Sequence, residues 1–370
     1  MRSMDYTNAF RDPALCRSLL DRLSASLAGP MRFMEVCGTH TVAIFQSGLR
    51  ALLPKDITHL SGPGCPVCVT HDSEIAVFLD LAGKDGVIIA SFGDLLRVPG
   101  PDRRSLKHAL AEGARVEVVY SSLDALALAK NNPTDTVVFL GIGFETTAPT
   151  VAAALQMARR EGLKNFTVLC LHKLVPPALR CLLSDADCAV DAFLLPGHVS
   201  TILGVAPYRF LAEEFHRPGI VAGFDPADIL FALCLMAKQR AAKRYEVINA
   251  YRRAAADDGN PKARAVLAEV FRHSDALWRG IGRIPQSGLM LAPDYEKLDA
   301  FARFGLSLPE TAPIPGCGCG AVLSGKMAPS ECPLFGKACT PAQPVGPCMV
   351  STEGSCAAYY AYTNHQNTKI

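Results

Sequence analysis

Cysteine is the residue type through which this sequence could do most of its chemistry. The chain has 14 cysteines in 370 residues. A thiolate is a nucleophile and a ligand for soft metals, and two neighbouring thiols can store two electrons as a disulfide. Six cysteines crowd the last 54 residues: Cys317, Cys319, Cys332, Cys339, Cys348 and Cys356. Five others lie in apolar segments, where a buried structural role is expected: Cys16, Cys170, Cys181, Cys188 and Cys234.

The late cysteines are spaced like the ligands of a metal centre. Fourteen residues separate Cys317 from Cys332, six separate Cys332 from Cys339, and sixteen separate Cys339 from Cys356. Four thiolates on loops rich in Gly and Pro can surround a [4Fe–4S] cluster. Zinc accepts the same ligands, but the two close C-x-x-C pairs usual in zinc sites are absent. We therefore favour an iron–sulfur cluster over zinc or metal-free thiols, and six cysteines leave open which four bind.

A second motif, Cys65-Pro66-Val67-Cys68, follows a predicted strand and precedes a predicted helix that starts near Asp72. A C-x-x-C pair in this position is typical of a redox dithiol, because a helix start lowers the pKa of a thiol and Pro fixes the turn. The sequence therefore favours a two-electron dithiol/disulfide switch. The alternatives are half of a metal site or two inert cysteines in a tight turn.

A third motif, from Glu35 to Thr41, carries Cys37 and His40 just ahead of an amphipathic helix. Residues three apart on a helix share one face, so both side chains could reach one ligand. The helix dipole favours a thiolate there, which makes Cys37 a candidate nucleophile or soft-metal ligand. A Cys–His acyl-transfer site is one alternative, but no third residue can be assigned to orient His40. In the structural alternative, Thr39 caps the helix and Cys37 packs.

Three further polar residues, Asp94, Glu145 and His198, lie in Gly-containing turns after predicted strands. In an open parallel sheet such turns gather at the carboxyl ends of strands, where ligands bind. The turn around Glu145, GIGFETT, has the spacing of neither the dinucleotide fingerprint nor the phosphate-binding P-loop. Their gathering at one edge indicates a shared cleft, although the sequence assigns no individual role to any of the three.

The elements that must position these residues alternate between short β-branched runs and longer amphipathic stretches. This alternation predicts parallel α/β architecture. Strands are expected at 57–60, 87–90, 116–120, 137–140, 166–171, 192–195 and 220–222, and helices at 41–53, 72–81, 123–130, 147–160 and 177–183. Seven strands exceed one short sheet, and the segment 131–133 (Asn-Asn-Pro) could join two units. We therefore expect two similar α/β lobes, 31–130 and 131–225, with a cleft between them.

The two ends of the chain have a different character. We expect an N-terminal helix within residues 1–30 that packs on a third domain, residues 226–370. Asp225-Pro226 has the form of a helix start, with Asp as the N-cap and Pro at the first position, and this helix is expected to run to about Arg253. Beyond residue 280 the chain is rich in Gly, Pro and Cys, which predicts a helical, loop-rich iron–sulfur domain.

Composition excludes several classes of function. The chain has 37 Lys and Arg against 35 Asp and Glu and no basic block, which argues against a nucleic-acid binder. The longest apolar run, Ile229–Ala237, is about half of a bilayer span, so no membrane helix is expected. The N-terminus carries charges where a signal peptide needs an apolar core. We therefore expect a cytoplasmic protein, whose cysteines bind metals or stay reduced.

Several strings in this sequence resemble signature segments of the HypD family of hydrogenase maturation proteins. They are MEVCGTHT (34–41), GPGCPVC (62–68), SFGDLLRVPG (91–100), GFETTAP (143–149), PGHVS (196–200) and CPLFGKACTPAQPVGPCMVSTEGSCAAYY (332–360). The resemblance runs from about residue 30 to residue 362. It implies two similar α/β domains and a third domain that carries a [4Fe–4S] cluster.

The resemblance also implies particular roles for the cysteines. The cluster pattern of the family, C-x14-C-x6-C-x16-C, corresponds here to Cys317, Cys332, Cys339 and Cys356. It leaves Cys319 and Cys348 as non-ligands. The cysteine of CGTH, Cys37, matches the proposed ligand of a transient iron, with His40 close by.

For the protein as a whole, the resemblance implies an assembly scaffold with a redox role instead of a conventional turnover enzyme. The family works with the small chaperone HypC to assemble the Fe(CN)2CO unit of nickel–iron hydrogenases. Cyanide comes from HypE and HypF, and the finished unit passes to the precursor of the hydrogenase large subunit. The resemblance makes Cys65 and Cys68 the redox dithiol, and we expect electrons to pass from the cluster through this pair to the iron at Cys37.

Two other classes of function make different demands on the same residues. A stand-alone iron–sulfur thiol-disulfide oxidoreductase would need Cys65 and Cys68 but neither Cys37 nor HypC. A Cys–His hydrolase would need Cys37 and His40 but no cluster. Substitution of Cys37 and of the C-x-x-C pair therefore separates the three hypotheses.

Overall fold

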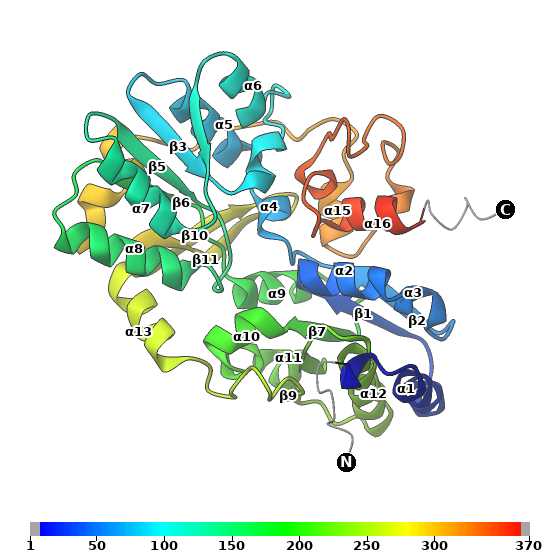
Figure 1. Cartoon of the computed structure of the whole chain (residues 1–370). Helices are drawn as coiled ribbons and strands as arrows, with labels where there is room; N and C mark the ends of the chain where they lie inside the picture. The colour runs from blue at the N-terminus through cyan, green and yellow to red at the C-terminus, as the bar shows by residue number, and fades with distance from the viewer. Residues whose placement is uncertain (1–7, 364–370) are drawn as a thin grey trace.

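The computed structural model describes residues 8–363, in which two parallel sheets and one hairpin organise the chain (Figure 1). The first sheet has the order β2-β1-β7-β8-β9, and the second has the order β4-β3-β5-β6. Every neighbouring pair in both sheets is parallel. The strands of the first sheet are β1 (Met31–Glu35), β2 (Ile57–Ser61), β7 (Ala192–Pro196), β8 (Gly219–Ala222) and β9 (Val247–Asn249). Those of the second are β3 (Val87–Ser91), β4 (Arg115–Val118), β5 (Thr136–Gly141) and β6 (Phe166–Cys170).

The predicted α/β class with parallel sheets is confirmed. Each of the seven predicted strands has a counterpart, whereas β1, β9 and the two strands of the hairpin were not predicted. Strands β3, β6 and β7 are buried along their whole length, as expected where helices cover both faces of a parallel sheet. Continuous apolar runs in the sequence therefore correspond to strands that are buried on both faces, including β6 at the edge of the second sheet.

The division into lobes at residue 130 is wrong. The chain builds β1 and β2 of the first sheet, continues through the whole second sheet, and returns to the first sheet at β7. The expected joint at 131–133 lies between α7 and β5, both of which belong to the second sheet. A strand pattern shows where strands occur, but the choice of neighbour in a parallel sheet depends on crossovers that leave no local signal.

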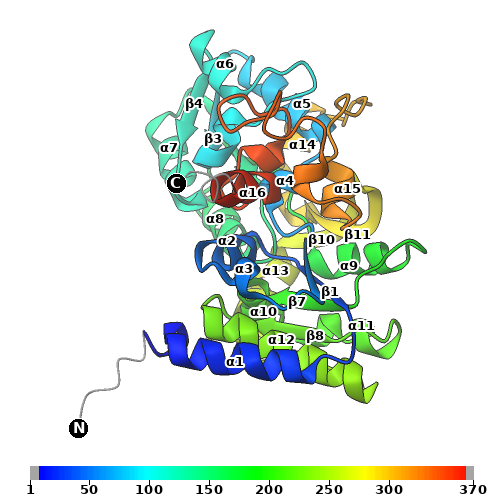
Figure 2. The same cartoon turned by 90° about the vertical axis from the view of Figure 1, so that its right-hand side faces the viewer.

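Helices cover both sheets (Figures 1 and 2). They are α1 (Pro13–Ser26), α2 (Gly38–Gln46), α3 (Leu49–Leu52), α4 (Pro66–Val69), α5 (Asp72–Ala82), α6 (Leu106–Ala111), α7 (Ser122–Asn131), α8 (Ala148–Arg160), α9 (Val175–Leu183), α10 (Gly197–Leu203), α11 (Phe210–Glu213), α12 (Pro226–Ala242), α13 (Pro261–Val270), α14 (Ala300–Phe304), α15 (Cys319–Leu323) and α16 (Ser355–Thr363). The predicted helices at 72–81, 123–130, 147–160 and 177–183 correspond to α5, α7, α8 and α9, and the one at 41–53 is divided into α2 and α3.

The range 226–370 is not one unit. Helix α12 starts as predicted at Pro226, but it ends at Ala242, where Lys243 takes the left-handed conformation, and β9 follows in the first sheet. The N-terminal helix α1 packs on α12 and so covers the first sheet instead of the cysteine-rich segment (Figure 2). The antiparallel hairpin of β10 (Phe271–Trp278) and β11 (Gly282–Leu291) lies against the second sheet (Figure 1).

The cysteine-rich segment is the last part of the described chain. It contains α15, two short 3-10 turns (Pro329–Glu331 and Pro347–Met349) and α16. In Figure 1 this segment lies beside α4 and α2. No helix within residues 8–363 has the length and apolar character needed to cross a membrane.

Candidate functional site

A cavity of about 360 Å³ lies where the carboxyl ends of strands from both sheets meet. Its wall is formed by segments that follow β1, β2, β3, β5 and β7, together with Ser351 and Glu353 from the C-terminal part of the chain. Cys37, Asp94 and His198 are among its lining residues. We refer to this space as the Cys37 cavity.

Cys37 is fixed at the junction of β1 and α2. It is the N-cap of α2 with an extended backbone (φ −152°, ψ 120°), and its side chain is buried. Its backbone N–H donates to Glu35 Oε2 at 3.0 Å, and the Thr41 hydroxyl donates to Glu35 Oε1 at 2.5 Å. The fully buried Glu35 therefore ties the end of β1 to the first turn of α2. These contacts hold Cys37 at the cavity wall.

The surroundings of Cys37 favour the neutral thiol. Burial raises the pKa of Cys37 to about 12, and the negative charge of Glu353, with a smaller contribution from Glu35, adds to the increase. The effect of the helix start, on which the sequence argument relied, is outweighed. A cation that binds the Cys37 sulfur must therefore displace its proton.

His40 does not share the cavity with Cys37. Its Nε2 donates to the Gly223 carbonyl at 2.9 Å, and its ring packs on Phe224 at 4.6 Å between centroids. Burial lowers the pKa of His40 to about 4, so the neutral ring carries its proton on Nε2. The expectation that Cys37 and His40 face one ligand is wrong, because an N-cap with extended backbone does not follow the i, i+3 geometry of a helix. The imidazole that lines the cavity is His198.

Glu353 closes one side of the Cys37 cavity. Its Oε1 accepts a hydrogen bond of 2.8 Å from the Thr39 hydroxyl, and the backbone at Gly38 is so close that a Cβ there would overlap Glu353. Two residues earlier, the Ser351 hydroxyl donates to Asp94 Oδ2 at 3.1 Å. The segment from Ser351 to Glu353 therefore contacts α2 on one side and the turn after β3 on the other.

Glu145 lies directly behind the cavity wall, which its neighbours Phe144 and Thr146 help to form. Its side chain is 2% exposed, and its Oε1 accepts from the Val175 backbone at 2.9 Å. Its Oε2 has no hydrogen-bond partner among residues 8–363. Burial raises the pKa of Glu145 to about 7, so the carboxyl is partly protonated at neutral pH.

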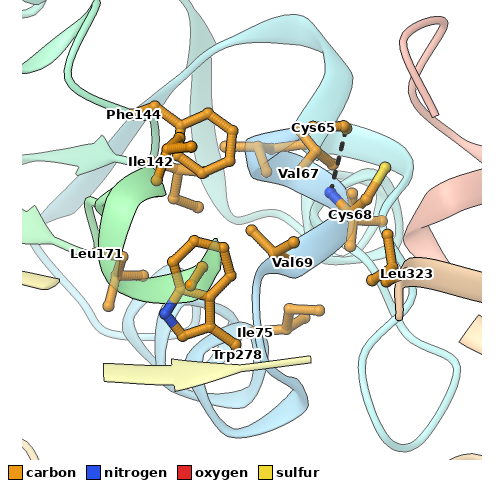
Figure 3. Close-up of a cluster of buried hydrophobic side chains, with 14 of the residues drawn as sticks. Cys65, Val67, Cys68, Val69, Ile75, Ile142, Phe144, Leu171, Trp278 and Leu323 are labelled. Carbon is orange, nitrogen blue, oxygen red and sulfur yellow. Dashed lines mark hydrogen bonds between the residues drawn. The ribbon is translucent and has the colours of Figure 1, made fainter. Parts of the chain in front are cut away.

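The C-x-x-C pair lies on α4, inside the protein (Figure 3). Cys65 is 4% exposed and Cys68 is fully buried, and the Cys68 backbone N–H donates to Cys65 Sγ at 3.3 Å. Burial raises the pKa of Cys68 well above its ordinary range, and the neighbouring thiols of Cys348 and Cys65 add to the effect. The expected lowering at a helix start is therefore reversed for Cys68.

The residue before this pair touches the Cys37 backbone. The Gly38 N–H donates to the Gly64 carbonyl at 2.9 Å. A Cβ at Gly64 would overlap the backbone of Val36 and Cys37, so only glycine permits this approach. The dithiol motif and the Cys37 motif are separate in the sequence, but their backbones are in direct contact and form one unit.

The six late cysteines line one small, largely apolar cavity, which we call the cysteine cavity. Its lining cysteines are Cys317, Cys319, Cys332, Cys339, Cys348 and Cys356. Apolar side chains, among them Val322, Leu334 and Met349, complete the wall. The Val345 backbone N–H donates to Cys339 Sγ at 3.4 Å. The clustering that the sequence indicated is thus present in space.

Two of these thiols connect the cysteine cavity with α4. Cys319 Sγ and Cys348 Sγ are 3.0 Å apart and both are buried. The turn that carries Cys348 packs against α4, where the Cys348 thiol contributes to the raised pKa of Cys68. Leu323, at the end of α15, lies beside Cys68 (Figure 3). Cys348 therefore neighbours both Cys319 in the cysteine cavity and Cys68 of the dithiol.

Comparison with known proteins identifies the family. The profile of the HypD family, described as the hydrogenase formation hypA family, matches residues 14–363. The chain belongs to the HypD family. It is 44% identical over 368 residues to the hydrogenase maturation factor HypD2 of Bradyrhizobium diazoefficiens, covering 97% of each chain. It is also 44% identical over 372 residues to HypD of Escherichia coli (98% and 100% covered) and 40% identical over 368 residues to HypD of Cupriavidus necator (97% of each).

Some residues of the site in this HypD-family chain were predicted from the sequence, and others were not. Cys37 and the pair on α4 lie in one backbone unit, as described above. The missed residues are Cys319 and Cys348, because 28 residues separate them, and Glu353, whose position opposite Cys37 depends on the fold. The one signal for Glu353 in the sequence is its place in the string STEG, within the segment that resembles the family.

Proposed function

We propose that this protein is the scaffold that holds iron at Cys37 while the Fe(CN)2CO unit of a nickel–iron hydrogenase is assembled. Membership of the HypD family makes it a hydrogenase maturation factor, and the proposal adds the site and the chemistry. Low-spin iron that carries cyanide and carbon monoxide favours a soft thiolate, which Cys37 supplies once its proton is displaced. A HypC-type chaperone would supply a second thiolate, HypE- and HypF-type proteins would deliver cyanide, and the large-subunit precursor would receive the finished unit.

The observation that carries the proposal is the close packing from the late cysteines to Cys37. In the wall of the cysteine cavity, Cys348 neighbours Cys319 on one side and Cys68 on the other, and the residue before Cys65 touches the Cys37 backbone. Thiols at these positions can accept and return electrons in pairs. We infer that the dithiol of Cys65 and Cys68 delivers electrons to the Cys37 cavity.

The residues of the cysteine cavity fit a thiolate-bound cluster. Six thiols line this cavity, and an apolar wall with a backbone amide directed at Cys339 Sγ suits a cubane held by four thiolates. We propose Cys317, Cys332, Cys339 and Cys356 as its ligands. When bound, a [4Fe–4S] cluster supplies single electrons at low potential.

A stand-alone thiol-disulfide oxidoreductase fits the geometry less well. Such an enzyme must bring one of its sulfurs into contact with a disulfide of its substrate. Cys68 is fully buried and Cys65 is 4% exposed, so a substrate disulfide cannot reach them without rearrangement. A Cys–His hydrolase is also disfavoured, because His40 donates to Gly223 and does not line the Cys37 cavity.

Infrared spectroscopy of the complex with HypC tests the proposal, because iron-bound cyanide and carbon monoxide have separate stretching bands. We expect Cys37→Ser to abolish both sets of bands, and the double variant Cys65→Ser/Cys68→Ser to leave a complex without them. Cys181→Ser, a cysteine on α9 away from both cavities, is the matched control and should retain full bands. Full bands in Cys37→Ser would refute the iron site, and full bands in the double variant would refute the electron route.

A further inference from the structure

The turn of the β10–β11 hairpin is inserted between α4 and α15. Trp278, at the end of β10, is fully buried and packs against Val69 and Ile75 (Figure 3). It forms a bridge with Thr70, and the next backbone N–H, that of Arg279, donates to the Val69 carbonyl at 2.9 Å. The turn is therefore fixed directly on the helix that carries the dithiol.

The opposite side of the same turn touches the cysteine-rich segment. Gly280 has φ of +71°, and a Cβ at this position would overlap the Cα of Gly320. Gly320 follows Cys319, which lines the cysteine cavity and lies 3.0 Å from the sulfur of Cys348. The backbone of the turn therefore holds Arg279 between α4 on one side and the start of α15 on the other.

The Arg279 side chain is a buried cation at this junction. It is 4% exposed and forms an ion pair with Asp72, the first residue of α5, which is also buried. Burial alone would lower the pKa of Arg279, but the negative charges that Cys319 and Asp72 can carry outweigh it, and the net pKa is raised. The guanidinium therefore stays charged, and its charge interacts with the Cys319 thiol as well as with Asp72.

A charge in this position has a consequence for electron transfer. Reduction of a [4Fe–4S]2+ cluster to [4Fe–4S]+ adds one electron, and hence one negative charge, to a site that is shielded from water. A fixed cation nearby favours the reduced form, and interactions between buried charges are stronger than those at a surface. Asp72 works in the opposite direction, because its negative charge partly cancels that of Arg279.

We propose that Arg279 is a positioning residue whose buried charge sets the reduction potential of the metal centre in the cysteine cavity, with Asp72 as its counterweight. This inference rests on the cluster in the proposed function. The group whose potential is set is the thiolate-bound cluster, and the electron that reduces this cluster comes from an external one-electron reductant. An ion pair with only a structural role would hold the hairpin on α5 and leave the potential unchanged.

The test is a redox titration of the anaerobically purified protein, with dithionite as reductant and visible absorption and EPR as readouts. Arg279→Met removes the cation and should shift the equilibrium towards the oxidised cluster by about tenfold, which is about 59 mV for one electron. Asp72→Asn removes the counterweight and should shift it in the opposite direction by a similar factor. Arg279→Lys keeps the charge and should stay close to the wild type.

Lys173→Met is the matched control. Lys173 is also a buried cation paired with α5, because its Nζ lies 2.5 Å from Glu74 Oε1, but it lies in the wall of a different cavity, together with Cys170 and His172. Its loss should cost stability without changing the potential. If Arg279→Met fails to fold, Asp72→Asn still decides the sign of the shift.

Each outcome has a distinct meaning. Wild-type protein that binds no iron and sulfide, even after reconstitution, would overturn the proposed centre and this inference with it. A loaded centre with the same potential in wild type, Arg279→Met and Asp72→Asn would overturn the inference alone and leave the proposed function standing. Equal shifts in Lys173→Met and Arg279→Met would show that loss of stability, instead of charge, changes the potential. Opposite shifts in Arg279→Met and Asp72→Asn support the inference.

Discussion

Cys37 stands between a buried parallel strand and a helix, whereas the six late cysteines stand on loops between short helices and turns. The Cys37 backbone is fixed by Glu35, Thr41 and the carbonyl of Gly64, through hydrogen bonds that need no ligand. In the cysteine cavity, α15 has 5 residues and the 3-10 turns at Pro329–Glu331 and Pro347–Met349 have 3 each. One site is built by the fold, and the other depends on what its thiols bind.

Helix α16 belongs to the late segment, but it is anchored on α2 and α3 of the N-terminal part of the chain. Tyr359 packs on Phe45 of α2 with ring centroids 4.8 Å apart, and Arg50 lies over the Tyr359 ring at 4.4 Å. These contacts involve aromatic and cationic side chains and no thiol. We therefore distinguish α16 from the loops 314–350 that carry five of the six late cysteines.

Removal of the metal centre should have the largest effect on stability. We expect the backbone amides of 314–350 to exchange with solvent at least about 100-fold faster after chelation, because folding and metal binding are coupled where a site lacks secondary structure. The strands of both sheets and α16 should exchange at unchanged rates. Hydrogen–deuterium exchange with mass spectrometry measures both regions in one experiment.

Protein with serine at Cys332 and Cys339 is the matched variant, because it loses ligands without exposure to a chelator. It should reproduce the pattern of the chelated protein. Faster exchange throughout β1 and β7 would break the comparison, since the first sheet would then also depend on the metal centre.

The sequence predicted the built site better than the ligand-dependent one. Seven strands were found because short β-branched runs alternate with amphipathic stretches, and β3, β6 and β7 stand out as continuous apolar runs buried on both faces. The motifs of Cys37 and Cys65 lie at the turns expected for them. The pairing of the sheets was not predicted, because the return of the chain to β7 is a crossover without a local signal. Cys37 and His40 were placed on one face because helical spacing was extended to a residue outside the helix.

The late cysteines show the reverse limit. Their number and spacing indicated a metal centre, but spacing contains no information about which thiols lie next to one another. Cys319 and Cys348 come together only because two loops fold onto each other and onto α4. Glu353 likewise reaches Thr39 across 314 positions of the chain. Long-range contacts of this kind require the three-dimensional structure.

The second prediction concerns Glu145, because burying its carboxyl behind the wall of the Cys37 cavity lowers the stability of the protein at neutral pH. Its pKa rises from 4.5 to about 7 in the folded protein, so between these pH values the folded state keeps a proton that the unfolded state releases. Stability should therefore fall as the pH rises from about 4.5 to about 7, by about 3 kcal/mol in total, and then remain constant. Glu145→Gln should abolish this part of the pH dependence.

The difference between the wild type and Glu145→Gln is the quantity to measure, by urea unfolding at pH 5, 6, 7 and 8. His40 and His172 have lowered pKa values of about 4 and about 3, and their contributions rise with pH in part of the same window. Both histidines are present in the two proteins, so their contributions cancel in the difference. An equal pH dependence in both proteins would show that the Glu145 carboxyl is not protonated in the folded state.

The smallest expected effect tests the joint between the two sites, at Gly64. Gly64→Ala places a methyl group into the backbone of Val36 and Cys37, and this overpacking should destabilise the protein by about 2 kcal/mol in urea unfolding. Gly93→Ala is the matched control, because its methyl group would meet only Val118 Cγ1 at an ordinary 3.8 Å, and it should change stability by less than about 0.5 kcal/mol. The atoms nearest to the added methyl group belong to Val36 and Cys37 and not to a late cysteine, so the variant should retain its full iron and sulfide content. If Gly64→Ala instead lost its metal as well, the two sites would not be held independently, and the contrast between a built site and a ligand-dependent site would fail.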